Sequence, residues 1–282
     1  LYTDFQACTK LAQGAAMCCD SAHKTLPVLT GGAYLHLGPS APVQDETIIR
    51  NTLNLFGSTS PSYLILQSLD AANAALAGDW PQRLAECCKT LDVLRAQLNT
   101  LAAGCGAILP LALPGNTADR EPLKLTLDAA ALSTTGGALA KRLRTHKVEC
   151  EYADPRYLVM MFTPDNPSRD YTRVREAVAE ACAAFVPAEE NAVLPKQNAS
   201  AVPDFSALER ELRQTPPRCT IREAIFAAQE QISVAEALDR ICALPTVSCP
   251  PAIPITVSGE VVTAAAVRLM QQYGIESLSV LK

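Results

Sequence analysis

The sequence lacks several patterns that mark broad classes of protein. It has 11 cysteines but no C-x-x-C spacing, which excludes the ligand pattern of a zinc ribbon and the dithiol of a thioredoxin-type site. It has no excess of positive charge: 24 Lys and Arg against 29 Asp and Glu leave a net charge of −5, so we expect no nucleic-acid partner. Its apolar runs stop well short of the roughly 18–20 residues that a membrane span requires, so we expect no membrane partner.

The N-terminus also lacks the features of a targeting segment. Leu1–Gln6 has neither the basic region nor the apolar region of a signal peptide. The cysteine count is odd, and the adjacent pairs Cys18-Cys19 and Cys87-Cys88 lie in apolar runs, which favours reduced cysteines used as small hydrophobes. We therefore predict a cytoplasmic protein with no bound metal. Because an initiator Met is missing, we expect the sequence to begin partway through a longer protein.

The first hundred residues carry strand and helix signals in turn. Hydrophobic residues make up 49% of the chain, which is enough for a folded core. Residues 7–19 predict a short helix, a glycine stop and a buried strand, and residues 33–37 alternate like a second strand. Ser60-Pro61 is typical of a helix start, with a helix to Ala77. Asp79-Trp80-Pro81 opens a longer helix that we expect to reach Ala103.

From about residue 123 the sequence pattern changes to short strands alternating with helices. Strands are predicted at 124–128, 148–152 and 157–163, and helices at 133–145 and 170–185. This β-α-β-β-α order closes as an antiparallel sheet with helices on one face.

The C-terminal part begins with a segment rich in Pro, Asn, Ala and Gln. Residues 187–218 therefore predict a linker, with one short helix at 205–213. Two capping boxes follow, Thr220-x-x-Glu223 and Ser233-x-x-Glu236. A last helix at 263–273 and a strand near Leu278 are then expected.

The segment with the most reactive side chains is Asp20–Pro27. It offers a primary amine (Lys24), an imidazole (His23) and the Ser21 hydroxyl within one turn, directly after a predicted buried strand. Partial burial of such a lysine favours the neutral amine that a Schiff-base nucleophile needs. A neighbouring Ser and His can hold a phosphate, and Gly31-Gly32 allows close approach of the backbone. Taken alone, the pattern more often marks a surface lysine in a polar loop.

Three blocks of the sequence resemble the ornithine/lysine/arginine decarboxylase family, in the order in which that family has them. They are Ser21–His36, Phe56–Asp70 and Pro250–Glu260, and the similarity spans essentially the whole chain. The resemblance implies an α/β fold: a partial pyridoxal-phosphate-dependent transferase-like large domain, a small α+β antiparallel-sheet domain and a C-terminal α/β segment. The domains expected are 1–120, 121–186 and 219–282, with 187–218 as linker.

The same resemblance implies roles for single residues. Lys24 would be the Schiff-base lysine of pyridoxal 5'-phosphate, and His23 and Ser21 would contact its phosphate. Ser58 and Thr59 form a turn before a helix N-terminus, where amides favour a phosphate. The family presents this turn from a neighbouring subunit, so the resemblance implies a homodimer or higher homo-oligomer. For Ser58, plain helix capping is the alternative.

Some residues depart from the family pattern. In 239–244, Asp239 stands for the usual Gly and Leu244 for the usual Glu, while Ala252 and Ser258 replace a Gly and a Pro. The family's phosphate-binding turn, ring-stacking His and pyridine-pairing Asp all lie upstream of its lysine, and none precedes Leu1. We therefore expect the C-terminal portion of a longer decarboxylase, which by itself binds cofactor weakly and does not decarboxylate.

The leading function is therefore decarboxylation of a basic amino acid to a polyamine-type amine, with lysine, arginine and ornithine all open as the small-molecule substrate. The first alternative is a catalytically silent remnant or dimerising fragment. The second is an aminotransferase or lyase on the same fold.

Overall fold

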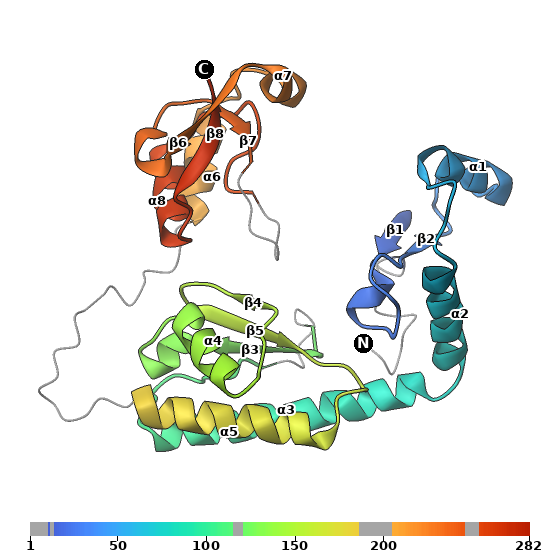
Figure 1. Ribbon diagram of the computed structural model, residues 1–282, viewed down its shortest axis with the longest axis vertical. Helices are drawn as coiled ribbons and strands as arrows, with labels where there is room; N and C mark the ends of the chain where they lie inside the picture. The colour runs from blue at the N-terminus through green and yellow to red at the C-terminus, as the bar shows by residue number, and fades with distance from the viewer. Residues whose placement is uncertain (1–10, 12–13, 115–120, 186–204, 246–253) are drawn as a thin grey trace, which may run out of the picture. The chain divides into compact units, whose positions relative to one another are not determined.

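The computed structural model describes residues 11, 14–114, 121–185, 205–245 and 254–282. The chain divides into two compact units (Figure 1). Unit 1 comprises Leu1–Gln97, Pro114–Leu125 and Met161–Thr172. Unit 2 comprises Leu98–Leu113, Thr126–Met160 and Arg173–Lys282.

Unit 1 begins with a two-stranded antiparallel ribbon. Strand β1 (Met17–Asp20) pairs with β2 (Tyr34–Leu37), and Cys18 lies opposite His36. Both strands were expected, but the prediction of a buried first strand is wrong, because Met17 and Cys19 are exposed. A ribbon of two strands leaves side chains of one face uncovered in this part of the chain. The helix expected in 7–13 falls outside the described residues, apart from Leu11.

A small core holds the loop between these strands against helix α2 (Tyr63–Ala77). The loop starts with a short 3-10 helix, η1 (Ala22–Lys24). Ala22 and Val28 are buried together with Ala72 of α2. The Leu29 amide donates to Ser68 Oγ at 3.1 Å, so polar contacts support the same packing.

Two features of the helical region differ from the prediction. Helix α1 (Glu46–Phe56) was not predicted, although Asp45 caps it by accepting from the Thr47 amide at 2.8 Å. Helix α2 begins at Tyr63, two residues later than the predicted Ser60-Pro61 start, because Ser62 is its N-cap and accepts from the Ile65 amide.

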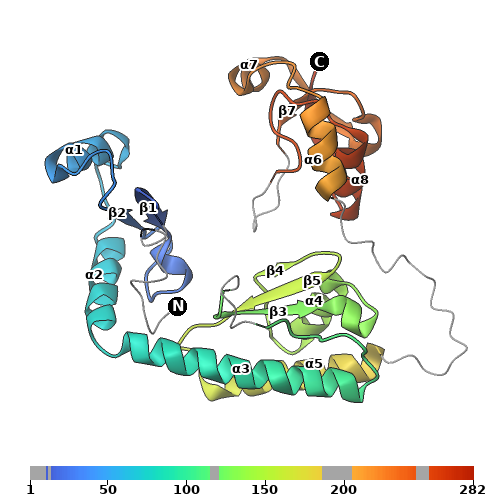
Figure 2. The same cartoon turned by 180° about the vertical axis from the view of Figure 1, so that it is seen from behind.

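Helix α3 (Trp80–Gly104) confirms the long helix of the sequence pattern. Its Leu84, Leu91, Leu94 and Leu98 are buried, as helical spacing predicts. Figures 1 and 2 show that α3 lies beside α5 (Ser168–Phe185). Cys87 Sγ and the Tyr171 hydroxyl, 3.3 Å apart, join the two helices.

The central sheet has the order β3-β5-β4. Strands β3 (Lys124–Asp128) and β5 (Tyr157–Met161) are antiparallel, since Phe162 N bonds to Leu123 O and Ala129 N to Arg156 O. Strand β4 (Tyr152–Ala153) pairs antiparallel with β5. With α4 (Gly136–Thr145), this confirms the predicted β-α-β-β-α order and antiparallel sheet. Leu125, Leu127, Leu158 and Met160 are its buried side chains.

Two boundaries in this region were predicted wrongly. Helix α4 starts at Gly136 and not at Ser133, because Ser133 has a left-handed backbone (φ 53°) and ends a separate 3-10 helix, η2 (Ala129–Leu132). The strand expected at 148–152 is reduced to β4, since Val148 instead bonds its amide to the Leu143 carbonyl at the end of α4.

The C-terminal part of unit 2 has its own core. Its sheet has the order β6-β8-β7, formed by Gln229–Ser233, Ser277–Leu281 and Cys242–Leu244, with antiparallel pairs. Helices α6 (Phe205–Gln214) and α8 (Ala264–Gln272) pack on one another, with Ala207 and Leu208 inside this core. Glu211 of α6 accepts from the Ala265 amide at 2.7 Å, so a side chain of one helix caps the other.

One of the two predicted capping boxes is present. Thr220 and Glu223 bond reciprocally at the start of α7 (Ile221–Phe226). The prediction of a second capping box is wrong. Ser233 precedes only a three-residue 3-10 helix, η3 (Val234–Glu236), and its side chain makes no bond to a backbone amide there. Its hydroxyl donates to the Glu236 carboxylate at 2.7 Å instead, while the Val234 amide bonds to the Glu276 carbonyl.

Candidate active site

The 3-10 helix η1 brings three of the five predicted site residues together. Strand β1 ends at Asp20, and Ser21 follows with an extended backbone at the N-cap position of η1. The Lys24 amide then donates to the Ser21 carbonyl at 3.2 Å, closing the turn. Ser21, His23 and Lys24 therefore lie within one turn of backbone, and the Ser21 hydroxyl makes no capping bond.

Lys24 is exposed, as is Ser21, while His23 is half-buried. The partial burial expected of Lys24 is therefore not found in this chain. The reason is local: η1 has three residues, and only Ala22 is directed into the small core. Among the described residues, no hydrogen bond or ion pair engages Lys24 Nζ.

His23 is held by the glycine pair at the far end of the loop. Its Nδ1 lies 3.0 Å from the Gly32 carbonyl oxygen, and its backbone amide donates to the same oxygen at 3.4 Å. Gly31 has φ +98°, a conformation that favours glycine, and Gly32 is buried. The close backbone approach that the glycines allow is thus used within the loop itself.

The β1–β2 ribbon carries a second group of polar side chains. His36 Nε2 lies 3.6 Å from the Asp20 carboxylate across the β1–β2 pair, and Cys18 Sγ donates to the same carboxylate at 3.4 Å. Asp20 therefore shapes the end of β1, immediately before the Lys24 turn.

Ser58 and Thr59 lie elsewhere, in the connection between α1 and α2. Both are exposed, and Ser58 Oγ accepts from the Ser60 amide at 3.1 Å. In the described part of the chain, no hydrogen bond or ion pair links either residue to the Lys24 turn. The N-terminus of α2 is already capped by Ser62.

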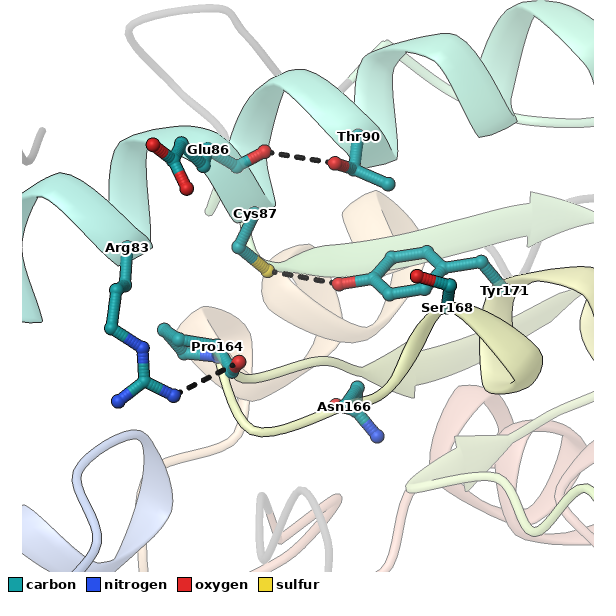
Figure 3. A pocket seen from close by; sticks show the side chains of 8 residues that line it. All are labelled: Arg83, Glu86, Cys87, Thr90, Pro164, Asn166, Ser168 and Tyr171. Atoms are coloured by element: carbon teal, nitrogen blue, oxygen red, sulfur yellow. Dashed lines mark hydrogen bonds between the residues drawn. The ribbon is translucent and has the colours of Figure 1, made fainter.

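A small pocket of about 230 Å³ lies between α3 and the start of α5 (Figure 3). None of the predicted site residues lines it. Its polar groups largely satisfy one another: Arg83 pairs with Asp165 at 2.8 Å, and burial raises the pKa of both Cys87 and Tyr171, which bond to each other. The lining residues are Arg83, Glu86, Cys87, Thr90, Pro164, Asn166, Ser168 and Tyr171.

The described residues contain no group of three or more His, Cys, Asp or Glu that could hold a metal ion. None of their helices combines the length and apolar character that a membrane crossing requires.

The stretch that contains the Lys24 turn is similar to a known protein family. Residues 5–115 match the Orn/Lys/Arg decarboxylase major domain. An arginine decarboxylase of Bacillus subtilis (strain 168) is 30% identical over 252 residues, which cover 89% of this chain and 48% of that protein. In this stretch and along most of its length, the chain is similar to the Orn/Lys/Arg decarboxylase family.

Two solved structures are similar to this chain in fold. The constitutive lysine decarboxylase of E. coli matches with a TM-score of 0.62 at 16% identity, covering 94% of this chain and 49% of that one. The lysine decarboxylase of Francisella novicida matches with a TM-score of 0.66 at 15% identity, covering 94% and 48%. Both confirm a mixed α/β fold with small antiparallel sheets. The chain spans about half the length of the curated relatives it matches.

Proposed function

We propose that this chain is part of a pyridoxal-phosphate-dependent decarboxylase. The enzyme would act on lysine, arginine or ornithine and yield a polyamine-type amine. The observation that carries the proposal is the grouping of Ser21, His23 and Lys24 in η1, inside the stretch that matches the family's major domain. The arginine and lysine decarboxylases among its relatives support a basic amino acid as substrate.

The donor groups of η1 fit the cofactor. A free primary amine suits its aldehyde, and a hydroxyl beside an imidazole suits its phosphate. Lys24 would hold the cofactor through Nζ, while Ser21 Oγ and a ring nitrogen of His23 would hold the phosphate. When bound, pyridoxal phosphate supplies the electron sink for loss of CO2. Lys24 Nζ must give up its place to the amine of the substrate, which its position in an exposed turn permits.

A second copy of the chain completes the proposed site. Ser58 and Thr59 are exposed and make no bond to the Lys24 turn of their own chain within the described residues. We therefore propose that Thr59, with Ser58, reaches the phosphate of a neighbouring subunit, in a cytoplasmic homodimer or larger homo-oligomer.

One observation favours the alternative, a catalytically silent remnant or dimerising fragment. Lys24 is exposed in this chain, and decarboxylation needs a site from which water is excluded. Exposed apolar side chains on α1 and α2, such as Phe56 and Leu64, suit association without chemistry.

Borohydride trapping tests whether Lys24 is the residue that binds the cofactor. The protein is incubated with pyridoxal phosphate, reduced and digested, and the modified lysine is identified by mass spectrometry. We expect the label on Lys24, its loss in K24A and its retention in K89A, since Lys89 is an exposed lysine of α3. Label on Lys89 or Lys10 in place of Lys24 would remove the assignment.

Activity is measured in parallel as CO2 release from carboxyl-labelled lysine, arginine and ornithine. The 282-residue chain and a version extended by whatever its gene encodes before Leu1 are compared. Release from one substrate that requires Lys24 supports the enzyme. Labelling of Lys24 without CO2 release in either version supports the silent alternative.

A further inference from the structure

The ring of His23 is held by an oxygen that can only accept. The Gly32 carbonyl lies 3.0 Å from Nδ1, and a carbonyl has no proton to give. The proton of this contact therefore belongs to Nδ1, and a neutral His23 carries none on Nε2. The second bond to the same carbonyl, from the His23 backbone amide, restrains the residue at both ends.

Gly32 holds its carbonyl in place by tight packing. Its amide donates to the Leu29 carbonyl at 3.1 Å, which closes a turn. A Cβ added at Gly32 would lie well inside van der Waals contact with Val28 Cγ1 and only 3.3 Å from the Leu29 oxygen. Leu69 of α2 lies 3.4 Å from the same point. A side chain at this position would therefore displace the carbonyl that orients His23.

We propose that Gly32 is a positioning residue that fixes His23 as the Nδ1–H tautomer and leaves Nε2 as the atom that meets the cofactor phosphate. This inference rests on the proposed function. A bare Nε2 presents a lone pair to the phosphate oxygens, so His23 holds the phosphate by donation only as the imidazolium. Gly32 thus determines which nitrogen of the His23 ring faces the phosphate. It also determines that His23 binds the phosphate in its protonated form.

The tautomer is measurable without cofactor. The chain has three histidines, His23, His36 and His146, so selective ¹⁵N labelling gives three ring patterns in long-range ¹H–¹⁵N spectra. The pattern that disappears in H23N belongs to His23. At a pH where the rings are neutral, we expect it to show Nδ1 protonated and Nε2 bare. The Nε2–H pattern would overturn the proposal.

Substitution at the glycine tests the positioning role. G32A should abolish the single Nδ1–H pattern of His23. Removing the clashing methyl groups in V28A/G32A should restore it, and V28A alone should keep it. His36, which lies 3.6 Å from Asp20 in the β1–β2 ribbon of unit 1, reports intact folding of the ribbon through an unchanged pattern. An unchanged His23 pattern in G32A would show that Gly32 does not position the ring.

Two substitutions of His23 separate its two nitrogens. Asparagine places an amide N–H near Nδ1, which keeps the bond to Gly32 but leaves nothing at Nε2. Glutamine places an amide N–H near Nε2, which can donate to a phosphate without taking up a proton. With pyridoxal phosphate as the probe, borohydride labelling of Lys24 should need about tenfold more cofactor in H23N than in H23Q, as loss of a hydrogen bond to a charged group implies.

The outcomes distinguish this inference from the proposed function. Equal cofactor requirements in H23N and H23Q would overturn the role of Nε2. Absence of label on Lys24 in the unsubstituted chain and its extended version would overturn the proposed function and, with it, the role of Nε2. The tautomer and its dependence on Gly32 would still be decided by the spectra alone.

Discussion

Asp128 is the most constrained carboxylate among the described residues of the central sheet. It is 4% exposed, and Arg156 donates to it through Nε at 3.1 Å and Nη2 at 2.6 Å. It also accepts from the Ala130 amide at 3.2 Å, so it caps η2 as well. This hydrogen-bonded pair raises the pKa of the Arg156 guanidinium.

Neutralising Asp128 should therefore destabilise the chain. We expect D128N to lower the free energy of unfolding by roughly 2–3 kcal/mol, because it leaves a guanidinium that is partly removed from water without its partner. D165N is the matched control, since its partner Arg83 is more exposed and such surface pairs contribute less than about 1 kcal/mol. Urea titration measures both. Equal shifts would contradict the argument.

Cysteine reactivity should follow burial. Burial raises the pKa of Cys182 and Cys242 to about 11, and both side chains are buried, whereas Cys19 is exposed. A thiol with a pKa of about 11 is thiolate in only about one molecule in a thousand at pH 8. We expect iodoacetamide to alkylate Cys19 first and to reach Cys182 and Cys242 only in urea. Mass spectrometry of a time course would detect the opposite order.

At the scale of elements, hydrophobic periodicity predicts those that pack against a core. Helix α3 and strands β3 and β5 follow the sequence pattern because their apolar positions are buried. Helix α1 has no fully buried residue, but Asp45 followed by Ile48, Ile49 and Leu53 was a signal that could have found it. The starts of α2 and α4 depended on which of several Ser and Thr residues became the cap.

The grouping of Ser21, His23 and Lys24 in one turn was predictable from the sequence, but the exposure of Lys24 was not. Ser21, His23 and Lys24 are consecutive or nearly so, and a strand followed by a loop brings them into one turn. The bond from His23 to Gly32 joins residues nine apart, and no local pattern specifies it. Burial of Lys24 depends on what packs over η1, which is a tertiary property.

The contact between α6 and α8 should make stability depend on pH. Bonds from the Ala265 amide and the Thr263 hydroxyl hold the pKa of Glu211 below its ordinary value of 4.5. A carboxyl whose pKa is lower in the folded state stabilises that state above pH 4.5 and loses this contribution as the pH falls through the folded-state pKa.

E211Q should accordingly reduce the stability of the folded chain at pH 7. It should also make the loss of stability between pH 7 and pH 3 less steep. E209Q is the control on the same helix, because Glu209 pairs with exposed Arg213 and bonds no helix terminus. Thermal unfolding between pH 3 and pH 7 gives the comparison. An E211Q curve parallel to that of the unsubstituted chain would refute the linkage.

At the scale of the whole molecule, exposed apolar side chains gather in unit 1. Within residues 11–37, Met17, Leu29 and Leu35 are 41%, 51% and 38% exposed. More strongly exposed side chains lie on α1 and α2, where Phe56 is 88% and Leu64 67% exposed. Exposed apolar side chains in such number are typical of sites of association.

We expect F56S/L64S to weaken self-association without lowering the melting temperature, because neither side chain is part of a core. F226S is the control, since Phe226 is similarly exposed but lies on α7 in unit 2. Sedimentation velocity over a concentration series measures the effect. If only F226S reduced association, the surface used would lie on unit 2.

The order of strands in the C-terminal sheet has a consequence for biosynthesis. Strand β8 is the middle strand, yet it follows both β6 and β7 in the chain. While a ribosome is translating the segment between β7 and β8, the two outer strands exist without any partner in this sheet. Their backbone amides acquire sheet partners only when β8 leaves the exit tunnel, so the sheet assembles in one late step and not strand by strand.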